Sequence, residues 1–294
     1  MSNQRLAWDG PILDNHFHLN RNGRYLDAAR DFRNAGGTDI VLIHCPDFKT
    51  PPSTKQGHKD AYQNTINMAE SVRSQLDLNV RVVLGPHPAA FAHQFIEWVE
   101  LDGEKGKEVA MENYRDSIDE AVKFYHEGKA HAIGEVGRPH WEVSQEIWDL
   151  SNDLLSETMA LAANEGFALQ LHVEGELEST YRDMARMAEK SGLSKDRLIR
   201  HYSPPNVNAE ITQGVTPSVL AGKGAIATLL ETAEQCSHGF LLETDYMDDL
   251  RRPGAVLGPK TVPKRTNQLL AAGIDEELLW RAHVDLPNRL YGQE

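Results

Sequence analysis

The sequence predicts an α/β protein in which parallel strands and their connecting helices close into a (β/α)8 barrel. Eight short apolar runs, often rich in β-branched residues, alternate with longer amphipathic stretches along the chain. Such alternation favours right-handed βαβ units and a parallel sheet. A length of 294 residues is typical of one such barrel, so we expect residues 1–294 to form a single domain.

The expected elements follow one another along the chain. Strands are expected at residues 12–15, 39–43, 80–84, 130–134, 167–171, 197–200, 224–228 and 239–243. Helices are expected at residues 24–35, 59–74, 113–127, 145–165 and 177–191. An open doubly wound sheet is the alternative, but it would need a glycine-rich phosphate-binding turn after the first strand, where this chain has His16-Phe17-His18.

The composition narrows the class of protein. A formal charge of −14 argues against an extensive nucleic-acid-binding surface, because lysines and arginines supply phosphate affinity. No apolar run is long enough to cross a membrane, and residues 1–9 lack the apolar core of a signal peptide. The only cysteines are Cys45 and Cys236, which fits a reducing compartment. We therefore expect a cytoplasmic protein with no membrane partner.

The first expected strand carries a His-x-His pair. Side chains alternate between the two faces of a strand, so His16 and His18 share one face and Phe17 takes the other. Two imidazoles on one face can bind a single metal ion, while Phe17 packs into an apolar layer. For an isolated pair of this kind, two polar residues at the exit of a strand would be the favoured interpretation.

Metal-ligating side chains recur where later strands end, and in a barrel these ends meet on the face where active sites are built. The set consists of His16, His18, Glu135, His172, His201 and Asp245. Imidazole nitrogens and carboxylate oxygens are typical ligands of divalent metals. Six ligands are too many for one catalytic ion, but suit two divalent ions (Zn, Mn, Mg, Co or Ni) that share a bridging carboxylate. Glu135, opposite the first strand, is the candidate bridge.

Other constellations are weaker. The sequence has no Gly-x-Ser-x-Gly elbow, phosphate-binding Gly-x-x-x-x-Gly-Lys loop or Cys-x-x-Cys pair. Cys45 beside His44 could be a nucleophile with its base, but adjacent strand residues point apart, so a packing role is expected. His44, His87 and Arg138 also follow strands, and for them structural and functional roles both stay open.

The ordered set of motifs resembles the TatD family of metal-dependent hydrolases, within the amidohydrolase superfamily. The resemblance runs from residue 14 to the closing residues 286–292. Its motifs are Asp14-Asn15-His16-Phe17-His18, Gly85-Pro86-His87-Pro88, Gly134-Glu135-Val136-Gly137, His172, His201 and Glu243-Thr244-Asp245. The resemblance implies a TIM-like barrel, two divalent ions and phosphodiester hydrolysis, most often deoxyribonuclease activity.

The resemblance also implies individual roles. His16, His18 and Asp245 would hold one ion, His172 and His201 the other, and Glu135 would bridge them. His87 would contact a substrate phosphate. As a ligand on the last strand, Asp245 could also accept the proton of the attacking water as a general base. The substrate would be a nucleic-acid end or a small phosphate-bearing molecule.

The chain departs from the family pattern at three places. Arg138-Pro139-His140 replaces a common Leu-Asp, Val173-Glu174-Gly175-Glu176 replaces a segment that often contains arginine, and Tyr246-Met247-Asp248-Asp249 replaces a Pro-Tyr type of turn. Arg138 is a candidate phosphate ligand. The irregular segment at about 246–264 is a candidate active-site loop. Basic residues in and near this loop could neutralise phosphate or form a solvated surface: Arg251, Arg252, Lys260, Lys264 and Arg265.

Two alternatives remain open at this stage. The acidic Glu174-Gly175-Glu176 stretch could repel polyanions, which would favour an amide, ester or lactone hydrolase that acts on a small molecule. A metal-binding scaffold without catalytic activity is the other possibility. It is less favoured because a structural zinc site needs only four ligands.

Overall fold

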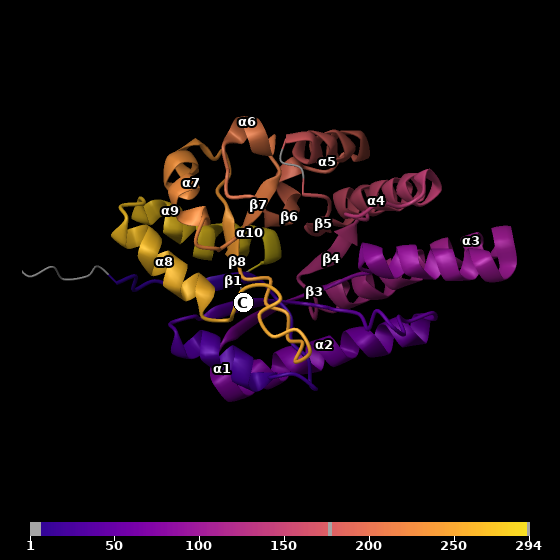
Figure 1. The fold of residues 1–294 in the computed structure, drawn as a ribbon, viewed down its shortest axis with the longest axis horizontal. Coiled ribbons are helices and arrows are strands. Elements are labelled where there is room, and N and C mark those ends of the chain that lie inside the picture. The colour runs from indigo at the N-terminus through magenta and orange to yellow at the C-terminus, as the bar shows by residue number, and fades with distance from the viewer. Residues whose placement is uncertain (1–6, 176–177, 293–294) are drawn as a thin grey trace, which may run out of the picture.

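The computed structural model describes residues 7–175 and 178–292. Within these residues, eight parallel strands pair in sequential order, from β1 to β8 (Figure 1). The strands are β1 Leu13–Phe17, β2 Asp39–Ile43, β3 Asn79–Leu84, β4 Ala132–Gly137, β5 Leu169–His172, β6 Leu198–Ser203, β7 Thr216–Leu220 and β8 Leu241–Glu243. The sheet curls back on itself, so that its first and last strands meet. At this junction His18 N donates to the carbonyl of Tyr246, just after β8, at 2.9 Å. The sequential order and this contact confirm the barrel and exclude the doubly wound alternative.

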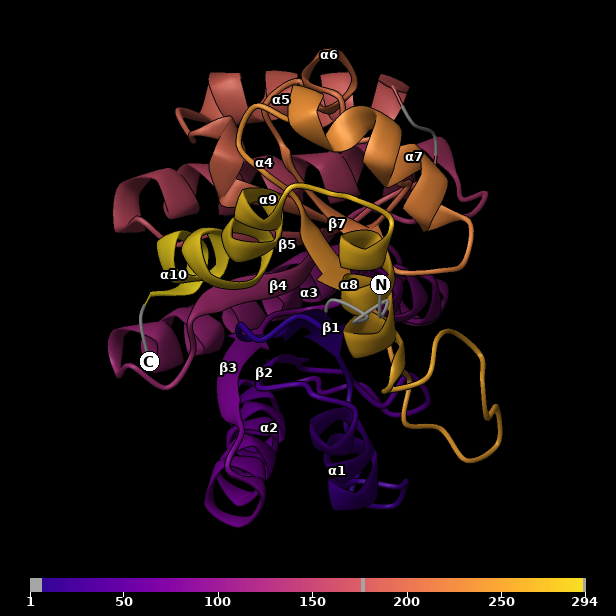
Figure 2. The same cartoon turned by 90° about the vertical axis from the view of Figure 1, so that its left-hand side faces the viewer.

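Helices follow most strands and pack around the outside of the sheet. Figure 2 shows α1 and α2 on one side of the strands and α4 to α7 on the other. The first helices are α1 Leu26–Asn34, α2 Lys55–Leu76, α3 Pro88–His126, α4 Gln145–Glu165 and α5 Glu178–Ser191. The later ones are α6 Ala209–Thr212, α7 Ala225–Thr232, α8 Thr261–Ala271, α9 Glu276–Trp280 and α10 Leu286–Tyr291. No helix in the described ranges has the length and apolar character needed to span a membrane.

The strand expected at residues 224–228 is wrong. These residues begin α7, and the seventh strand is Thr216–Leu220. A short apolar run cannot be assigned to a strand or a buried helix by periodicity alone. The true strand contains Pro217 and polar residues, which argue against a central strand. Its polar side chains serve the barrel interior, where Ser218 donates to Glu243.

The helix expected at 113–127 is only the end of a much longer element. α3 begins at Pro88 and bends at Asp102 and Gly103, where the backbone leaves helical geometry. Its two arms approach closely, since a Cβ on Gly106 would lie 1.9 Å from the carbonyl oxygen of Trp98. Charged residues and glycines around the bend conceal this pairing in the sequence. The bent helix projects away from the strands (Figure 1).

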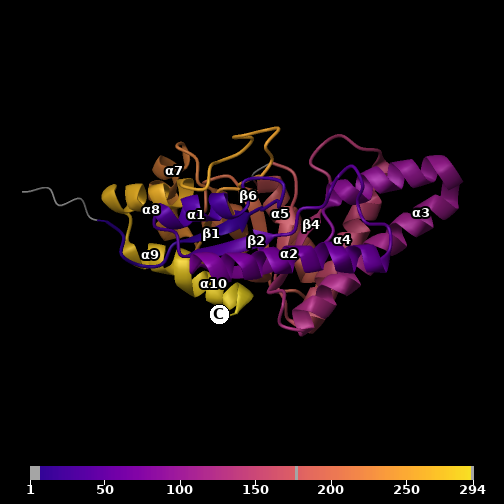
Figure 3. The ribbon, with the colours of Figure 1, turned by 90° about the horizontal axis from the view of Figure 1, so that it is seen from below.

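The interior of the barrel contains an apolar layer on the side of the closing segment and polar side chains at the carboxyl ends of the strands. The apolar layer consists of Leu13, Val41, Ile43, Val83, Ala132, Ala168, Ile199 and Leu241 together with Leu286, Leu290 and Tyr291 of the closing segment. Figure 3 shows α10 at this end and the loop after β8 at the opposite end. The carboxyl ends of the strands are therefore left for polar side chains.

Three sequence predictions include residues that lie outside the described ranges. Residues 1–6, which belong to the segment expected to lack a signal peptide, lie outside the described residues. So do Glu176 of the acidic stretch and residue 177, the expected start of α5. The two cysteines, both described, are free.

Candidate metal centre

The six expected ligands converge at the carboxyl ends of the strands. They come from β1 and its end, β4, β5, β6 and the residues after β8. The pairing register shifts between Asp14 and Phe17, between Ile133 and Val136, and between Arg200 and Ser203. These irregularities contain His16, Glu135 and His201, and irregularities of this kind re-aim side chains. Local breaks in the hydrogen-bond ladder thus coincide with positions of the expected ligands.

Glu135 lies between two groups of histidines. Its Oε1 is 3.4 Å from Nε2 of His16 and 3.5 Å from Nε2 of His18. Its Oε2 is 2.7 Å from Nδ1 of His172 and 3.5 Å from Nε2 of His201. The two carboxylate oxygens therefore face different histidines, which is the arrangement that a bridging carboxylate requires.

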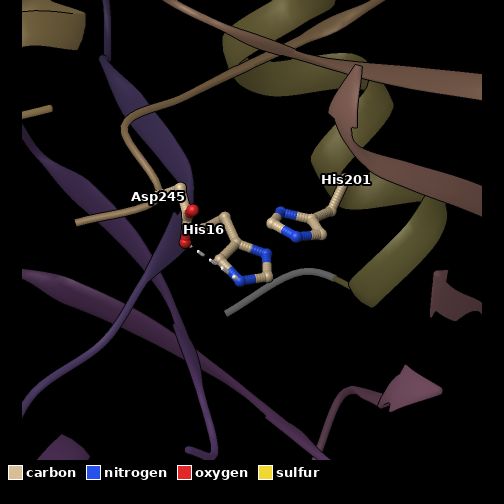
Figure 4. A group of neighbouring side chains, drawn as sticks. All are labelled: His16, His201 and Asp245. Atoms are coloured by element: carbon tan, nitrogen blue, oxygen red, sulfur yellow. Dashed lines mark ion pairs between the residues drawn. The ribbon is translucent and has the colours of Figure 1, made fainter. Parts of the chain in front are cut away.

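Asp245 closes the side of the centre near β1. Its Oδ1 lies 3.8 Å from Nε2 of His16 and 3.6 Å from Nε2 of His18. The rings of His16 and His201 stack with centroids 3.9 Å apart. Figure 4 shows Asp245 and His201 on different sides of His16. His201 therefore lies near both groups, since its Nε2 is also 3.2 Å from Nδ1 of His172.

Hydrogen bonds on the far side of three rings set which nitrogen is free to bind a metal. Nδ1 of His16 donates to Gln170 Oε1 at 2.8 Å, and Nδ1 of His18 donates to the Ile43 carbonyl at 3.2 Å. Nδ1 of His201 donates to Glu243 Oε1 at 3.0 Å. A neutral imidazole with hydrogen on Nδ1 presents a lone pair at Nε2. All three Nε2 atoms point into the centre.

Gln170 is itself oriented by neighbours. Its amide nitrogen donates to the Asn15 carbonyl at 3.1 Å and to the Tyr291 hydroxyl at 2.9 Å. The Tyr291 hydroxyl in turn donates to Asn15 Oδ1 at 2.7 Å. Because both amide hydrogens are used in this way, the carbonyl oxygen of Gln170 faces His16. The closing segment therefore helps to orient a candidate ligand.

Several carboxylates of the centre are buried close together. Burial alone would raise the pKa of Glu135, but His87 and His16 hold it well below its usual range. Burial disfavours the charged form of His16, yet Glu135 and neighbouring carboxylates raise the pKa of His16 to about 10. A protonated imidazole or a divalent cation can each supply the positive charge that these carboxylates require. This set of nitrogen and oxygen donors fits divalent metal ions.

Comparison with known proteins identifies the family. The model of the family described as TatD related DNase matches residues 13–292. The chain belongs to this family. It is a TatD-family hydrolase, as the sequence resemblance predicted.

The chain is also similar to one curated protein and to solved structures. The chain is 31% identical over 288 residues to the uncharacterized protein MJ1127 of Methanocaldococcus jannaschii, covering 97% of this chain and 96% of that protein. The TatD-like protein AF1765 of Archaeoglobus fulgidus has a TM-score of 0.61 at 14% identity, covering 95% of this chain and 99% of its own. YJJV, a TatD homolog from Escherichia coli, has a TM-score of 0.61 at 15% identity, covering 96% and 98%. The two solved structures show the shared fold.

His87, the residue that the TatD resemblance assigns to substrate phosphate, lies at the edge of the centre. Its Nε2 is 3.5 Å from Glu135 Oε2, and its Nδ1 accepts the N–H of Ala89 at 3.0 Å at the start of α3. An acceptor Nδ1 places the hydrogen of the neutral ring on Nε2. His87 therefore presents a hydrogen-bond donor to the centre, not a metal-binding lone pair.

Arg138, the first departure from the TatD pattern, does not present its guanidinium to a substrate. It is 2% exposed and pairs with both carboxylate oxygens of Glu174, Nε donating to Oε2 at 2.8 Å. It also donates to Asp183 and Asn152 at 2.8 and 2.9 Å. This geometry argues against the expected phosphate contact. Two departures from the family pattern, Arg138 and Glu174, thus neutralise each other.

The loop after β8, Thr244 to Lys260, lines a large cavity next to the centre. The cavity has a volume of about 1150 Å³ and reaches His18. Loops after β1 and β2 also line it, and they contribute Arg21, Lys49 and Phe48. Arg251 and Arg252 belong to the lining, whereas Arg265 is buried and donates to the Ala221 carbonyl at 3.0 Å. Lys260 pairs with Asp31 at 3.1 Å.

Sequence reasoning missed the residues that orient the ligands. Gln170 and Glu243 each lie two positions before an expected ligand, His172 and Asp245. Strand alternation puts such residues on the same face, so the spacing was a usable signal. His140 was noted only as a departure, although its Nδ1 lies 2.8 Å from Nε2 of His172.

Proposed function

We propose that this TatD-family chain is a metal-dependent phosphodiesterase that acts as a deoxyribonuclease on nucleic-acid ends, with two divalent cations. The observation that carries the proposal is the position of the Glu135 carboxylate. Its Oε1 faces His16 and His18, and its Oε2 faces His172 and His201. His16, His18 and Asp245 would hold one cation, and His172 and His201 the other. Glu135 would bridge them.

The chemistry follows from these positions. Bound cations would supply an acidified water and positive charge opposite the scissile phosphoryl group. Asp245 then accepts the proton of the attacking water. Burial by itself would raise the pKa of Asp245, but the neighbouring His18, His201 and His16 lower it, so its carboxylate is ionised at neutral pH. His87 donates its Nε2 hydrogen to a non-bridging phosphate oxygen.

The cavity supports a polymeric substrate. Pockets for small molecules usually measure about 300–1000 Å³, and the cavity beside His18 exceeds this range at about 1150 Å³. Four basic residues line it, Arg21, Lys49, Arg251 and Arg252. Phe48 is 37% exposed and lies edge-to-face on His87 at 5.0 Å. Such an aromatic ring beside the phosphate donor could stack on a base.

The alternative is a hydrolase of amide, ester or lactone bonds in a small molecule. The main argument for this alternative was the acidic stretch after His172. The bidentate pairing of Glu174 with Arg138 compensates much of that negative charge. A cytoplasmic location stays a prediction that rests on the two free cysteines.

The test is metal exchange with a panel of substrates. Metal-stripped protein is reloaded with Zn, Mn, Mg, Co or Ni and assayed on linear and circular single-stranded DNA, esters, lactones and lactams. We expect cleavage of linear DNA that depends on added metal and is weak on circles. Turnover of only the esters, lactones or lactams would favour the alternative. Metal uptake without any turnover would favour a scaffold.

A further inference from the structure

His172 differs from the other histidines of the centre in the partner of its second ring nitrogen. His16, His18 and His201 each donate from Nδ1 to a buried oxygen, as described above. His172 is turned around, with Nδ1 directed at Glu135 Oε2 at 2.7 Å. Its Nε2 points outward and lies 2.8 Å from Nδ1 of His140. The partner that orients this ring is therefore another imidazole.

The loop after β4 holds His140 in this place. Gly137 approaches β5 so closely that a Cβ there would lie 2.0 Å from the carbonyl oxygen of His172. The next residue, Arg138, donates its N–H to that carbonyl at 3.1 Å, and its side chain is anchored by Glu174. Pro139 restricts the backbone that follows. His140 emerges beside His172, with its ring edge-to-face on Trp141 at 5.2 Å.

We propose that His140 is a positioning residue of the metal centre. Its Nδ1 accepts the Nε2 hydrogen of His172, so that the lone pair on Nδ1 of His172 faces Glu135 and His201. The opposite direction of this hydrogen bond would put the hydrogen of neutral His172 on Nδ1 and leave no lone pair for a cation there. The proposal rests on the two-cation function above.

The partner of His172 also distinguishes the two proposed cation sites. Gln170 and Glu243, which orient His16 and His201, are fully buried, whereas His140 is exposed on a loop. A hydrogen bond at the surface competes with water and constrains its partner less. The cation held by His172 therefore binds more weakly than the cation held by His16 and His18.

The experiment is calorimetric titration of the metal-stripped full chain with Zn²⁺. We expect two sites in the wild type, and loss of about 10- to 100-fold in the affinity of the weaker one in His140→Ala. His140→Asn keeps an acceptor oxygen near the position of Nδ1 and is expected to restore most of this affinity. His93→Ala is the matched control, because His93 is exposed and its ring lies 6.0 Å from that of the same Trp141.

A second readout reports the hydrogen bond directly. In the zinc-loaded protein, nitrogen-15 spectra of labelled histidine should place the hydrogen of His172 on Nε2 in the wild type and in His140→Asn. Unchanged affinities in His140→Ala, or a hydrogen on Nδ1 of His172 in the wild type, would overturn the role of His140. Uptake of only one Zn²⁺ by the wild type would instead contradict the two-cation function.

Discussion

At the scale of the residue, the hydrogen-bond partner on the far side of an imidazole decides what that ring can do. His16 and His201 donate from Nδ1 to Gln170 and Glu243, so their Nε2 lone pairs are available to a cation. His87 accepts at Nδ1 from Ala89 and is left with a donor. The same residue type is therefore suited to be a metal ligand at two positions and a hydrogen-bond donor to substrate at a third, as the proposed function requires.

Replacing Glu135 with alanine tests the bridge. Glu135→Ala removes both oxygens that separate the histidine pairs, so we expect loss of hydrolysis and of most binding of the second cation. The apolar layers do not include Glu135, so the barrel should stay folded. Elemental analysis, DNA cleavage and circular dichroism check these three expectations. Near-normal turnover in the metal-replete variant would reject the bridging role.

At the scale of the element, the ends of β4 and β5 set the spacing of the centre. Gly137 has φ 152 and allows the backbone of β4 to lie against the carbonyl of His172. Register shifts in β1, β4 and β6 fall at positions of candidate ligands. The pairing register of these three strands is thus irregular at the residues that form the candidate site.

Gly137→Ala should disturb this junction. A Cβ there would meet the His172 carbonyl oxygen at 2.0 Å, so we expect a loss of about 2–4 kcal/mol in the free energy of unfolding, with weaker metal binding. Urea denaturation measures the first effect and zinc titration the second. Gly128→Ala is the control, because Gly128 has φ +69 but an added methyl group there would meet nothing within 4 Å. An equal loss in both variants would mean that backbone strain, not the contact, is responsible.

The loop between β8 and α8 carries a separate prediction about nucleic-acid binding. Arg251 and Arg252 line the cavity and share the carboxylate of Asp249. The double change Arg251→Ala and Arg252→Ala should weaken binding of single-stranded DNA. It should also lower the salt slope of the binding constant by about 1.4, for two lost phosphate contacts.

Fluorescence anisotropy at several salt concentrations measures this slope. Arg115→Ala with Lys129→Ala makes the same change in charge at exposed positions outside the cavity lining. If this control lowers binding as much as the loop variant, the effect comes from net charge and the loop has no specific role.

At the scale of the whole molecule, the last residues of the chain complete the barrel that the first strand begins. His283 accepts the N–H of Leu13 at 3.1 Å and lies 3.0 Å from Thr266 Oγ1. Tyr291 bonds to Asn15 and Gln170, and Gln170 orients His16. The carboxyl-terminal segment therefore supports both the fold and the centre from the opposite end of the barrel.

The burial of His283 makes stability depend on pH. Burial lowers its pKa from 6.5 to about 4, so the unfolded chain binds more protons between these values. Stability from this group is present above pH 6.5 and is lost as the pH falls toward 4. Between about pH 7.5 and pH 5 we expect a loss of about 2 kcal/mol that is absent in His283→Gln. Urea unfolding at both pH values measures it, and equal pH dependence in the two proteins would contradict the assignment.

The sequence by itself determined the fold class and the six candidate ligands that converge at the carboxyl ends of the strands. Strand periodicity placed His16 and His18 on one face, and the alternation of strands and helices placed separate strand ends at one rim of the barrel. Local patterns carry this information because side-chain alternation and βαβ handedness are nearly independent of distant contacts. The same patterns failed at β7, which contains Pro217 and whose Ser218 donates to the buried Glu243.

Only the tertiary structure decided which hydrogen-bond and ion-pair partners surround the candidate ligands and the basic residues. It paired Arg138 with Glu174, separated Arg265 from the cavity, and brought His140 to His172 and Gln170 to His16. Residues up to 154 positions apart meet in these contacts. Hydrogen-bond direction and charge neutralisation depend on such distances and orientations, which no local pattern in the chain encodes.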